Sequence, residues 1–308
     1  MKLSLLDQWE KDAIARGMSQ KTIDGYRYSL LHFEKIIVGG DHIGDITKMV
    51  RADKMALRAY VDQQRRDGLT TKTISGRLNA LSSFFEFLII EDIRKDNPVI
   101  EIRKRYLSRY KTDSEEHTHK LISIQEAAKM VTNAFDPRDK ALLMVLFKTG
   151  VRRGELLRMD VSDIDFQLGE IELKPTKKRS NLNVLFDDET NQTLRRWVAV
   201  RACRSPYDDA LWISTTGRRI GKGALDYAIR QIALRIGLHD PSSSRMEDHF
   251  SAHCCRHWFS THLRRSGMPR EFIQELRGDV RREAIDIYDH ISPEELRESY
   301  LVHVPKLF

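Results

Sequence analysis

Apolar positions recur three and four residues apart through the first 95 residues of the chain, a spacing that predicts amphipathic α-helices. The clearest runs are "LLDQWEKDAIA" (5–15), "IDGYRYSLLHFEKII" (23–37) and "ISGRLNALSSFFEFLII" (74–90). The hydroxyl residues Ser19 and Thr70 stand shortly before the last two runs and are typical helix N-caps. We therefore predict a helical domain over residues 1–102.

The remainder of the chain mixes helical patterns with one alternating segment. Ser123 and Glu126 have the spacing of a capping box, and Pro137 and Gly150 fit the start and end of a helix. The segments "GEIELKP" and "LNVLF" resemble short strands, and the polar turn "TKKRSN" between them predicts an antiparallel hairpin. Helical patterns follow to the C-terminus. The prediction is a mainly α chain with a small antiparallel β-sheet, whose second, α+β domain spans residues 121–308.

Residues 103–120 lack periodicity and are predicted to link the two domains. Their N-terminal part, "RKRYLSRYK", is the densest basic cluster of the chain and has two tyrosines interleaved. Its basic residues are Arg103, Lys104, Arg105, Arg109 and Lys111. Such a cluster is either a solvated linker or a strap that crosses a phosphate backbone.

Composition narrows the class of protein. Apolar residues make up 41% of the chain and charged residues 31%, which is typical of a soluble globular protein. The longest apolar run, "ALLMVLF", is far shorter than the roughly 18 residues of a membrane helix. An acidic N-terminus argues against secretion, and three cysteines suit a reducing cytoplasm. We therefore expect no membrane partner, and the net charge of +7 mildly favours a polyanionic one.

Four stretches contain residues that could carry chemistry. They are "TGVRRGELL" with Arg152 and Glu155, the hairpin tip "KPTKKRSN" with Lys174, Lys177, Lys178 and Arg179, "HCCRHWFSTH" with His253 and Arg256, and "RGDVRREAIDIYDH" with Asp279 and Tyr288. His253 and Arg256 are three residues apart and would share a helix face. Each stretch alone is a weak signal.

Metal and nucleotide sites fit these stretches poorly. His253 and His257 have the spacing of a zinc helix, but the zinc-protease motif needs Glu where this chain has Cys254. The segment "GRRIGKG" has three residues between its first two glycines where a phosphate loop has four, and no Ser or Thr follows Lys222. We predict no metal and no cofactor.

Taken together, the four stretches resemble the tyrosine recombinase (phage integrase) family, including its Xer-type members. "TGVRRGEL" resembles the first arginine box of that family, and "HCCRHWFSTHL" resembles its H-x-x-R box. "LRGD", followed nine residues after Asp279 by Tyr288, resembles the C-terminal box. The N-terminal helices resemble the core-binding domain, so residues 121–308 correspond to the catalytic domain. The resemblance covers nearly the whole chain.

The resemblance implies a site-specific DNA recombinase that cleaves and rejoins strands through a covalent 3′-phosphotyrosyl intermediate. Tyr288 would be the nucleophile, and Arg152 and Arg256 would clamp the phosphate. Lys177 would be the proton donor, with Lys174 and Lys178 as alternatives. His253 would be a second acid–base group or a hydrogen-bond donor to the phosphate. Glu155 is better placed to brace Arg152 or the helix than to touch phosphate. The partners would be specific double-stranded DNA sites and three further copies of the chain, in a prokaryotic or viral setting, at the nucleoid.

Basic residues of both domains are candidates for contact with DNA phosphates. They are Lys21, Lys72, Arg77, Arg103, Lys104, Arg105, Arg109, Lys111, Lys178 and Arg179. Two other functions compete with recombination. A type IB-like topoisomerase uses the same cleavage residues, and an accessory protein could bind DNA after losing the chemistry.

Asp279 departs from the family pattern, which usually has His or Trp at this position. An ionised carboxylate cannot donate a hydrogen bond to phosphate and would repel it. The carboxyl could be protonated, it could brace Arg152, Arg256 or His253, or the enzyme could be impaired. We favour the bracing role.

Overall fold

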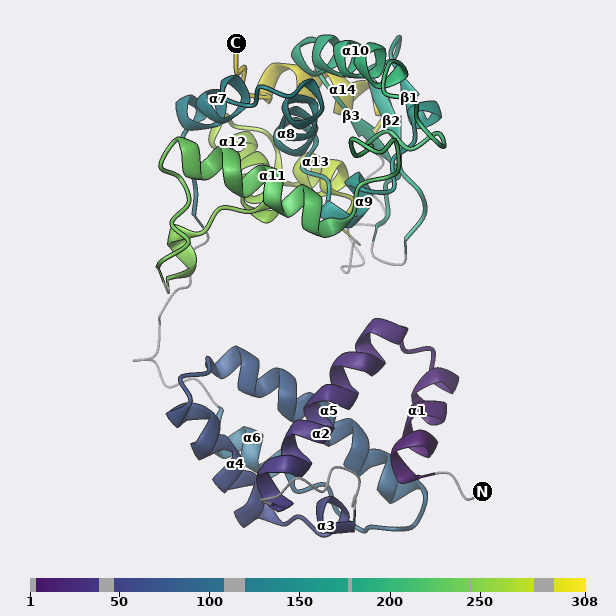
Figure 1. Cartoon of the computed structure of the whole chain (residues 1–308), viewed down its shortest axis with the longest axis vertical. Helices are drawn as coiled ribbons and strands as arrows, with labels where there is room; N and C mark the ends of the chain where they lie inside the picture. The colour runs from purple at the N-terminus through teal and green to yellow at the C-terminus, as the bar shows by residue number, and fades with distance from the viewer. Residues whose placement is uncertain (1–3, 39–46, 108–119, 177–178, 244, 280–290) are drawn as a thin grey trace. The chain divides into compact units, whose positions relative to one another are not determined.

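A computed structural model describes residues 4–38, 47–107, 120–176, 179–243, 245–279 and 291–308 (Figure 1). The chain divides into two compact units, Met1–Glu115 and Glu116–Phe308. The fold is mostly helical with one small antiparallel sheet, as the sequence predicts.

The first unit is entirely helical in its described part. Its helices are α1 (Leu5–Ala15), α2 (Gln20–Val38), α3 (Thr47–Val50), α4 (Lys54–Arg66), α5 (Thr71–Ile90) and α6 (Val99–Tyr106). The predicted N-caps are confirmed, because the Ser19 and Thr70 hydroxyls accept hydrogen bonds from the backbone N–H groups of Thr22 and Thr73. Helices α2 and α5 pack together and bury an aromatic core that includes Phe33.

Helix α6 crosses the predicted start of the linker. The sequence places that start at residue 103, whereas the helix continues to Tyr106. Val99 and Ile102 anchor the helix in the core of the first unit, and Arg103, Lys104 and Arg105 form its last turn. These three basic residues therefore belong to a helix that is packed on the core of the first unit, and not to an irregular linker. Arg109 and Lys111 lie outside the described residues.

The second unit contains eight α-helices, two short 3₁₀ helices and three strands among its described residues. The helices are α7 (Ile124–Thr132), α8 (Pro137–Thr149), α9 (Arg153–Leu156), α10 (Asp188–Ala202), α11 (Lys222–Arg235), α12 (Ala252–Arg265), α13 (Arg270–Arg277) and α14 (Pro293–His303), and the strands are β1 (Ile164–Asp165), β2 (Glu170–Glu172) and β3 (Asn183–Leu185). The strand order is β1-β2-β3, with antiparallel pairing throughout. The predicted hairpin is confirmed by the pairs Ile171–Val184 and Glu172–Asn183.

Helix α8 lies at the centre of the second unit, with α10 and α12 packed against it (Figure 1). Every residue from Ala141 to Thr149 is buried, and only Lys148 and Thr149 among them are polar. It ends where the sequence predicts, at Gly150, whose φ of 59° is left-handed. A Cβ at Gly150 would lie 2.3 Å from Cδ1 of Phe259 on α12. The close approach of these two helices places Arg152 beside α12.

Among the described residues, no helix is both long and apolar enough to cross a bilayer. In the same residues, no three His, Cys, Asp or Glu side chains are grouped as a metal site would require.

Candidate active site

Arg152 occupies the N-cap of α9, three residues after the end of α8 at Thr149. Its backbone N–H donates to Oε2 of Glu155 at 2.7 Å, and its Nη1 donates to Oε1 at 3.0 Å. Glu155 is buried, with 4% of its surface exposed. A buried carboxylate that accepts from both ends of one arginine fixes that side chain. The bracing of Arg152 by Glu155 that we predicted is thus a contact of this structure.

Arg256 reaches the same place from the second turn of α12. Its Nη1 donates to the carbonyl of Gly150 at 2.6 Å, and its Nη2 donates to the carbonyl of Arg277 at 3.2 Å. Only 5% of the Arg256 side chain is exposed. The end of α8 and the end of α13 therefore hold this guanidinium in one orientation.

Asp279, which follows α13, joins the two arginines. Its Oδ1 accepts from Nη2 of Arg152 at 3.0 Å and from Nη2 of Arg256 at 2.9 Å. Its Oδ2 lies 3.0 Å from Nε of Arg277. Two guanidinium groups from separate elements thus converge on a single oxygen atom. Of the interpretations that the sequence leaves open, bracing is the one whose contacts the structure contains.

Burial and neighbouring positive charges lower the pKa of Arg256 in this cluster. Burial is the main cause that lowers the pKa of Arg256 to about 10, and the positive charges of Arg152 and Arg277 lower it further. The carboxylates of Asp279 and Glu155 oppose the shift. At neutral pH Arg256 is still a cation, so the site is a crowded set of positive charges held together by two acids.

Two domain-level matches decide the family of this chain. Residues 92–295 match the phage integrase family, and residues 6–92 match the phage integrase N-terminal SAM-like domain. The chain belongs to the phage integrase family. The resemblance predicted from the arginine boxes is confirmed.

Relatives in this family are tyrosine recombinases of similar length. Tyrosine recombinase XerC of Haemophilus influenzae is 28% identical over 298 residues, which cover 95% of this chain and 94% of the relative. Tyrosine recombinase XerD of Oceanobacillus iheyensis is 26% identical over 301 residues, with 95% of each chain covered.

Solved structures share the fold at lower identity. The integrase of transposon Tn1549, in complex with transposon right end DNA, has a TM-score of 0.70 and 17% identity, covering 96% of this chain and 98% of that one. A lambda integrase dimer bound to a COC′ core site has a TM-score of 0.68 and 19% identity, covering 94% and 98%.

Arg179 of this chain does not lie where the sequence places it. We expected it among the DNA contacts at the tip of the hairpin, but its side chain is fully buried. Its Nη1 donates to Glu155 Oε2 at 3.1 Å and to the carbonyl of Arg277 at 3.1 Å, and its Nη2 donates to the carbonyl of Leu276 at 2.9 Å. Arg179 therefore ties the hairpin to α9 and to the end of α13, and it has no surface to offer a phosphate.

The other hairpin cations divide into described and undescribed positions. Lys174 Nζ lies 2.5 Å from Asp163 Oδ1 and 3.2 Å from Asp160 Oδ2. Hydrogen bonds to these two carboxylates raise the pKa of Lys174. Lys177 and Lys178 lie outside the described residues.

Tyr288 also lies outside the described residues, in the segment 280–290 that follows Asp279 directly. His253 is exposed in the first turn of α12, three residues before Arg256 and on the same helix face. Between them, Cys254 and Cys255 are buried in the core. Desolvation raises the pKa of the Cys255 thiol well above its ordinary value. Of the predicted catalytic residues, the structure brings Arg152, Arg256, Glu155 and Asp279 into one hydrogen-bonded cluster.

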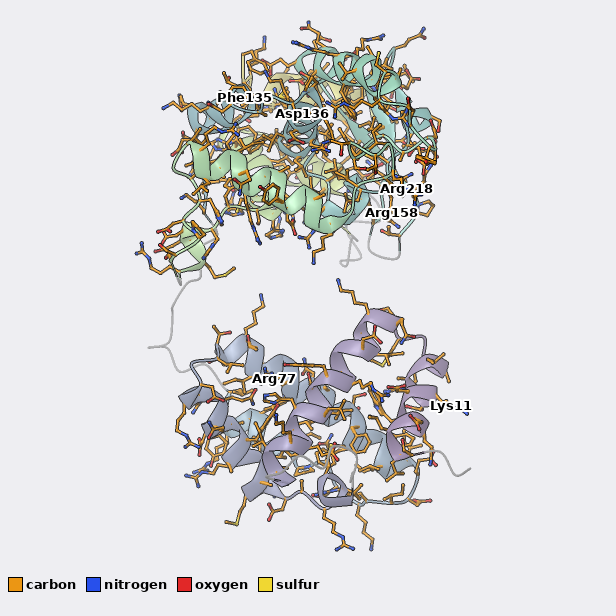
Figure 2. All side chains as sticks on the ribbon, in the orientation of Figure 1. Lys11, Arg77, Phe135, Asp136, Arg158 and Arg218 are labelled. Atoms are coloured by element: carbon orange, nitrogen blue, oxygen red, sulfur yellow. The ribbon has the colours of Figure 1, made fainter. Side chains whose placement is uncertain are left out.

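The first unit carries the remaining DNA-contact candidates. Lys21 and Lys72 are exposed in the first turns of α2 and α5. Arg77 is half-buried on α5, where its Nη1 lies 3.1 Å from Gln64 Oε1 and 3.2 Å from His32 Nε2 (Figure 2). Burial, followed by the charge of Arg77, lowers the pKa of His32. Hydrogen bonds to Gln64 and His32 therefore hold the side chain of Arg77, which is also a predicted contact for DNA phosphates.

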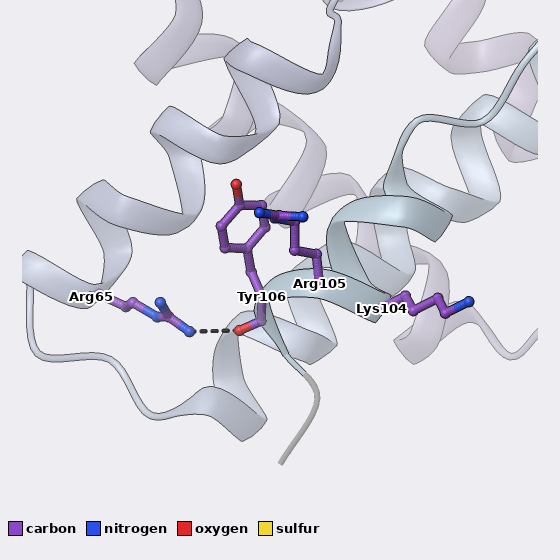
Figure 3. A pocket seen from close by; sticks show the side chains of 4 residues that line it. All are labelled: Arg65, Lys104, Arg105 and Tyr106. Carbon is purple, nitrogen blue, oxygen red and sulfur yellow. Dashed lines mark hydrogen bonds between the residues drawn. The ribbon is translucent and has the colours of Figure 1, made fainter. Parts of the chain in front are cut away.

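Helix α6 and the end of α4 border a hollow of about 410 Å³ that is lined by Arg65, Lys104, Arg105 and Tyr106 (Figure 3). Arg65 Nη2 donates to the carbonyl of Tyr106 at 2.6 Å. Lys104 and Arg105 are candidates from the sequence, whereas Arg65 is not. Only the packing of α4 against α6 brings Arg65 to them, and no local pattern signals that contact.

Proposed function

We propose that this phage integrase is a site-specific DNA recombinase that cleaves and rejoins DNA strands through a covalent 3′-phosphotyrosyl intermediate. One observation carries the proposal: Nη2 of Arg152 and Nη2 of Arg256 both lie within 3.0 Å of one oxygen atom. Convergent guanidinium donors of this kind match the non-bridging oxygens of a phosphodiester. Each guanidinium can donate two parallel hydrogen bonds to these oxygens, which a lysine ammonium cannot do in the same geometry.

The chemistry follows from these donors and a phenol. The phenolate of Tyr288 attacks the scissile phosphorus, the bond to the 5′-oxygen breaks, and the 3′-phosphate remains on the tyrosine. The leaving oxygen takes a proton and departs as a hydroxyl. Rejoining reverses the step with the 5′-hydroxyl of a second strand. Because the phosphodiester is exchanged and not hydrolysed, the reaction needs no nucleotide. Arg152 and Arg256 stabilise the charge that develops on the phosphate oxygens.

Lys177 is the proposed donor of the proton to the leaving 5′-oxygen. The engagement of Lys174 by Asp160 and Asp163 supports this choice, because a raised pKa makes that ammonium a weaker acid. His253 is proposed as the second acid–base group, since it precedes Arg256 by one helical turn.

The proposed partner is double-stranded DNA with specific recombination sites. Contacts to its backbone are proposed for Lys21, Lys72, Arg77 and the basic turn of α6, which spread positive charge over the first unit. We also propose that four copies act together, as in the lambda integrase tetramer bound to a Holliday junction, whose chain has the same fold. The bacterial relatives favour a protein that works on the nucleoid in the cytoplasm.

A suicide-substrate assay tests this function. The full chain is incubated with a pool of nicked duplexes that tile the DNA flanking its gene, and covalent adducts are separated on a denaturing gel. We expect an adduct that disappears in Tyr288→Phe and persists in Tyr227→Phe, a control tyrosine exposed on α11. Arg256→Ala should reduce the rate of adduct formation by about a hundredfold or more.

The products of paired sites then test recombination itself. Junctions and exchanged strands are expected from two sites, and supercoil relaxation without junctions would favour a topoisomerase. DNA binding with no adduct in any duplex of the pool would favour an accessory protein.

A further inference from the structure

Asp279 Oδ1 stands at the point where the two active-site arginines converge. We propose that Asp279 is an internal ligand of the phosphate clamp, which holds Arg152 and Arg256 in the DNA-free protein and is displaced by the scissile phosphate. The inference rests on the proposed function, because that function makes Arg152 and Arg256 the phosphate clamp.

The donors that Asp279 uses are the ones a phosphate would need. One carboxylate oxygen receives Nη2 of Arg152 at 3.0 Å and Nη2 of Arg256 at 2.9 Å, which are ordinary lengths for charge-assisted hydrogen bonds. A phosphodiester oxygen carries the same sign of charge and accepts the same bonds. The two anions repel each other at such separations, so they compete for the site.

Arg277 offers Asp279 a second partner. Its Nε lies 3.0 Å from Oδ2 of Asp279, yet this buried nitrogen has no aligned hydrogen-bond acceptor among the described residues. If the carboxyl group turns away from Arg152 and Arg256, it can align with Arg277 and keep an ion pair. In this proposal, Nε of Arg277 donates to the carboxylate of Asp279 once the phosphate has displaced it.

The backbone allows this turn without rearrangement of the fold. The N–H of Asp279 donates to the carbonyl of Gln274 at 3.1 Å, and Gly278 before it takes the left-handed conformation that ends α13. The Asp279 side chain is 31% exposed, so it has room to move toward solvent. The displacement that we propose is therefore a rotation of the Asp279 side chain on a backbone held by Gln274.

Internal occupancy has two consequences. In the DNA-free protein, Asp279 supplies the counter-charge that keeps two guanidinium groups close together. Toward an incoming phosphate it lowers the apparent affinity, because only the fraction of molecules with the carboxylate displaced can bind. A phosphate that brings further contacts, as in a cognate duplex, overcomes this competition better than an isolated anion does.

Inorganic phosphate binding tests the proposal without any cleavage step. The dissociation constant of inorganic phosphate for the full chain is measured in the Tyr288→Phe background, from the rise in melting temperature with phosphate concentration at fixed ionic strength. Asp279→Asn keeps the size of the side chain and removes its charge. We expect this variant to bind phosphate about tenfold more tightly, equivalent to about 1.4 kcal/mol.

Asp226→Asn is the matched control, because Asp226 pairs with Arg153, the neighbour of Arg152, at 2.7 Å. This variant makes the same chemical change at the partner of Arg153 and leaves the partner of Arg152 in place. Its dissociation constant for inorganic phosphate should match that of the parent. Adding Arg256→Lys to Asp279→Asn should abolish the gain and so assign it to the clamp. Asp279→Ser serves as a second variant if Asp279→Asn does not fold.

An unchanged or weaker phosphate affinity in the folded Asp279 variants would overturn the proposal, because it would make Asp279 a brace alone. Failure of the strand-cleavage assay is a separate result. The phosphate measurement uses a chain that lacks the nucleophile, so it stands whether or not Tyr288 forms an adduct.

Discussion

Arg179 and Glu155 form an ion pair that is buried on both sides, with side-chain exposures of 0% and 3% and 3.1 Å between Nη1 and Oε2. We expect Arg179→Met to lower the free energy of unfolding by roughly 3 kcal/mol, because buried Glu155 loses one of its donors and three carbonyls lose the bond from Arg179. Urea unfolding of the full chain, followed by fluorescence, measures this loss.

Arg245→Met is the control for Arg179→Met. Arg245 pairs with Glu247 and Asp248, but its side chain is 68% exposed. Exposed pairs contribute about 1 kcal/mol or less, so this variant should unfold close to the parent. Equal losses in the two variants would show that Arg179 does not stabilise the site.

Arg179 also marks the limit of prediction from the sequence. The hairpin itself was predictable, because its alternation and polar turn are local signals. The partners of Arg179, however, are 24 residues away at Glu155 and 97 residues away at Leu276. A basic residue on a polar turn has the pattern of a DNA contact, and only the docking of the hairpin onto α13 reveals that it is buried.

Other outcomes follow the same division between local and distant signals. The capping box of Ser123 and Glu126 starts α7 as predicted, because its bonds join residues three apart. Strand β1 has two residues and α6 is highly charged, so neither produces a clear periodicity. The boxes with Arg152 and Arg256 were recognisable from the sequence, whereas their convergence on Asp279 depends on three separate elements.

Lys148 is a fully buried charge of the second unit, and its ammonium is shared by two acids. Nζ lies 2.5 Å from Asp187 Oδ2 and 2.5 Å from Glu189 Oε2, with no side-chain exposure. Lys148→Met should lower the free energy of unfolding by about 3–4 kcal/mol, because two partly buried carboxylates lose their counter-ion.

Lys129→Met, at an exposed position of α7, is the control for Lys148→Met and should change stability by less than about 0.5 kcal/mol. Differential scanning calorimetry compares the two. Because Glu189 also accepts from the N–H groups of Leu307 and Phe308, Lys148→Met should expose the C-terminal residues to carboxypeptidase as well. Resistance equal to that of the parent would contradict this role.

His262 makes stability depend on pH. Burial is the main cause that lowers the pKa of its imidazole in the folded state, opposed by its hydrogen bond to the carbonyl of Ile122. The unfolded chain, with an ordinary pKa of about 6.5, then binds protons that the folded chain does not. This contribution to stability is complete above that pKa and is lost as the pH falls through it.

We therefore expect the melting temperature to fall between pH 7 and pH 5, and we expect His262→Gln to fall less steeply over the same range. The glutamine amide can still donate to Ile122, so the neutral hydrogen bond is retained. Parallel curves for the parent and His262→Gln would remove His262 as the source.

Arg105 tests the DNA surface proposed for α6. The substitution Arg105→Gln removes one positive charge from the hollow that Arg105 lines with Arg65 and Tyr106. We expect non-specific duplex affinity to fall for every sequence, and the slope of log K against log salt to become shallower by about 0.9. Fluorescence anisotropy at several salt concentrations measures both, and an unchanged slope would exclude a phosphate contact by Arg105.

Gly150 sets how closely α8 approaches α12, and therefore where the two arginines meet. Gly150→Ala adds a Cβ at 2.3 Å from Phe259 Cδ1, on a backbone whose φ of 59° is unfavourable for alanine. Gly237→Ala separates these two effects, because Gly237 has a φ of 74° and open space around its Cβ position. The control should lose about 1 kcal/mol from its conformation alone.

Gly150→Ala should lose that amount and a further 1–3 kcal/mol or so from overpacking. The clash also has a catalytic consequence, because the carbonyl of Gly150 accepts from Nη1 of Arg256. A shift of this carbonyl misplaces the guanidinium, so strand cleavage should slow in Gly150→Ala and stay at the parental rate in Gly237→Ala. Phe259→Leu should relieve the clash and restore part of both losses. If Gly150→Ala and Gly237→Ala were equally stable and equally active, the contact between α8 and α12 would not position Arg256.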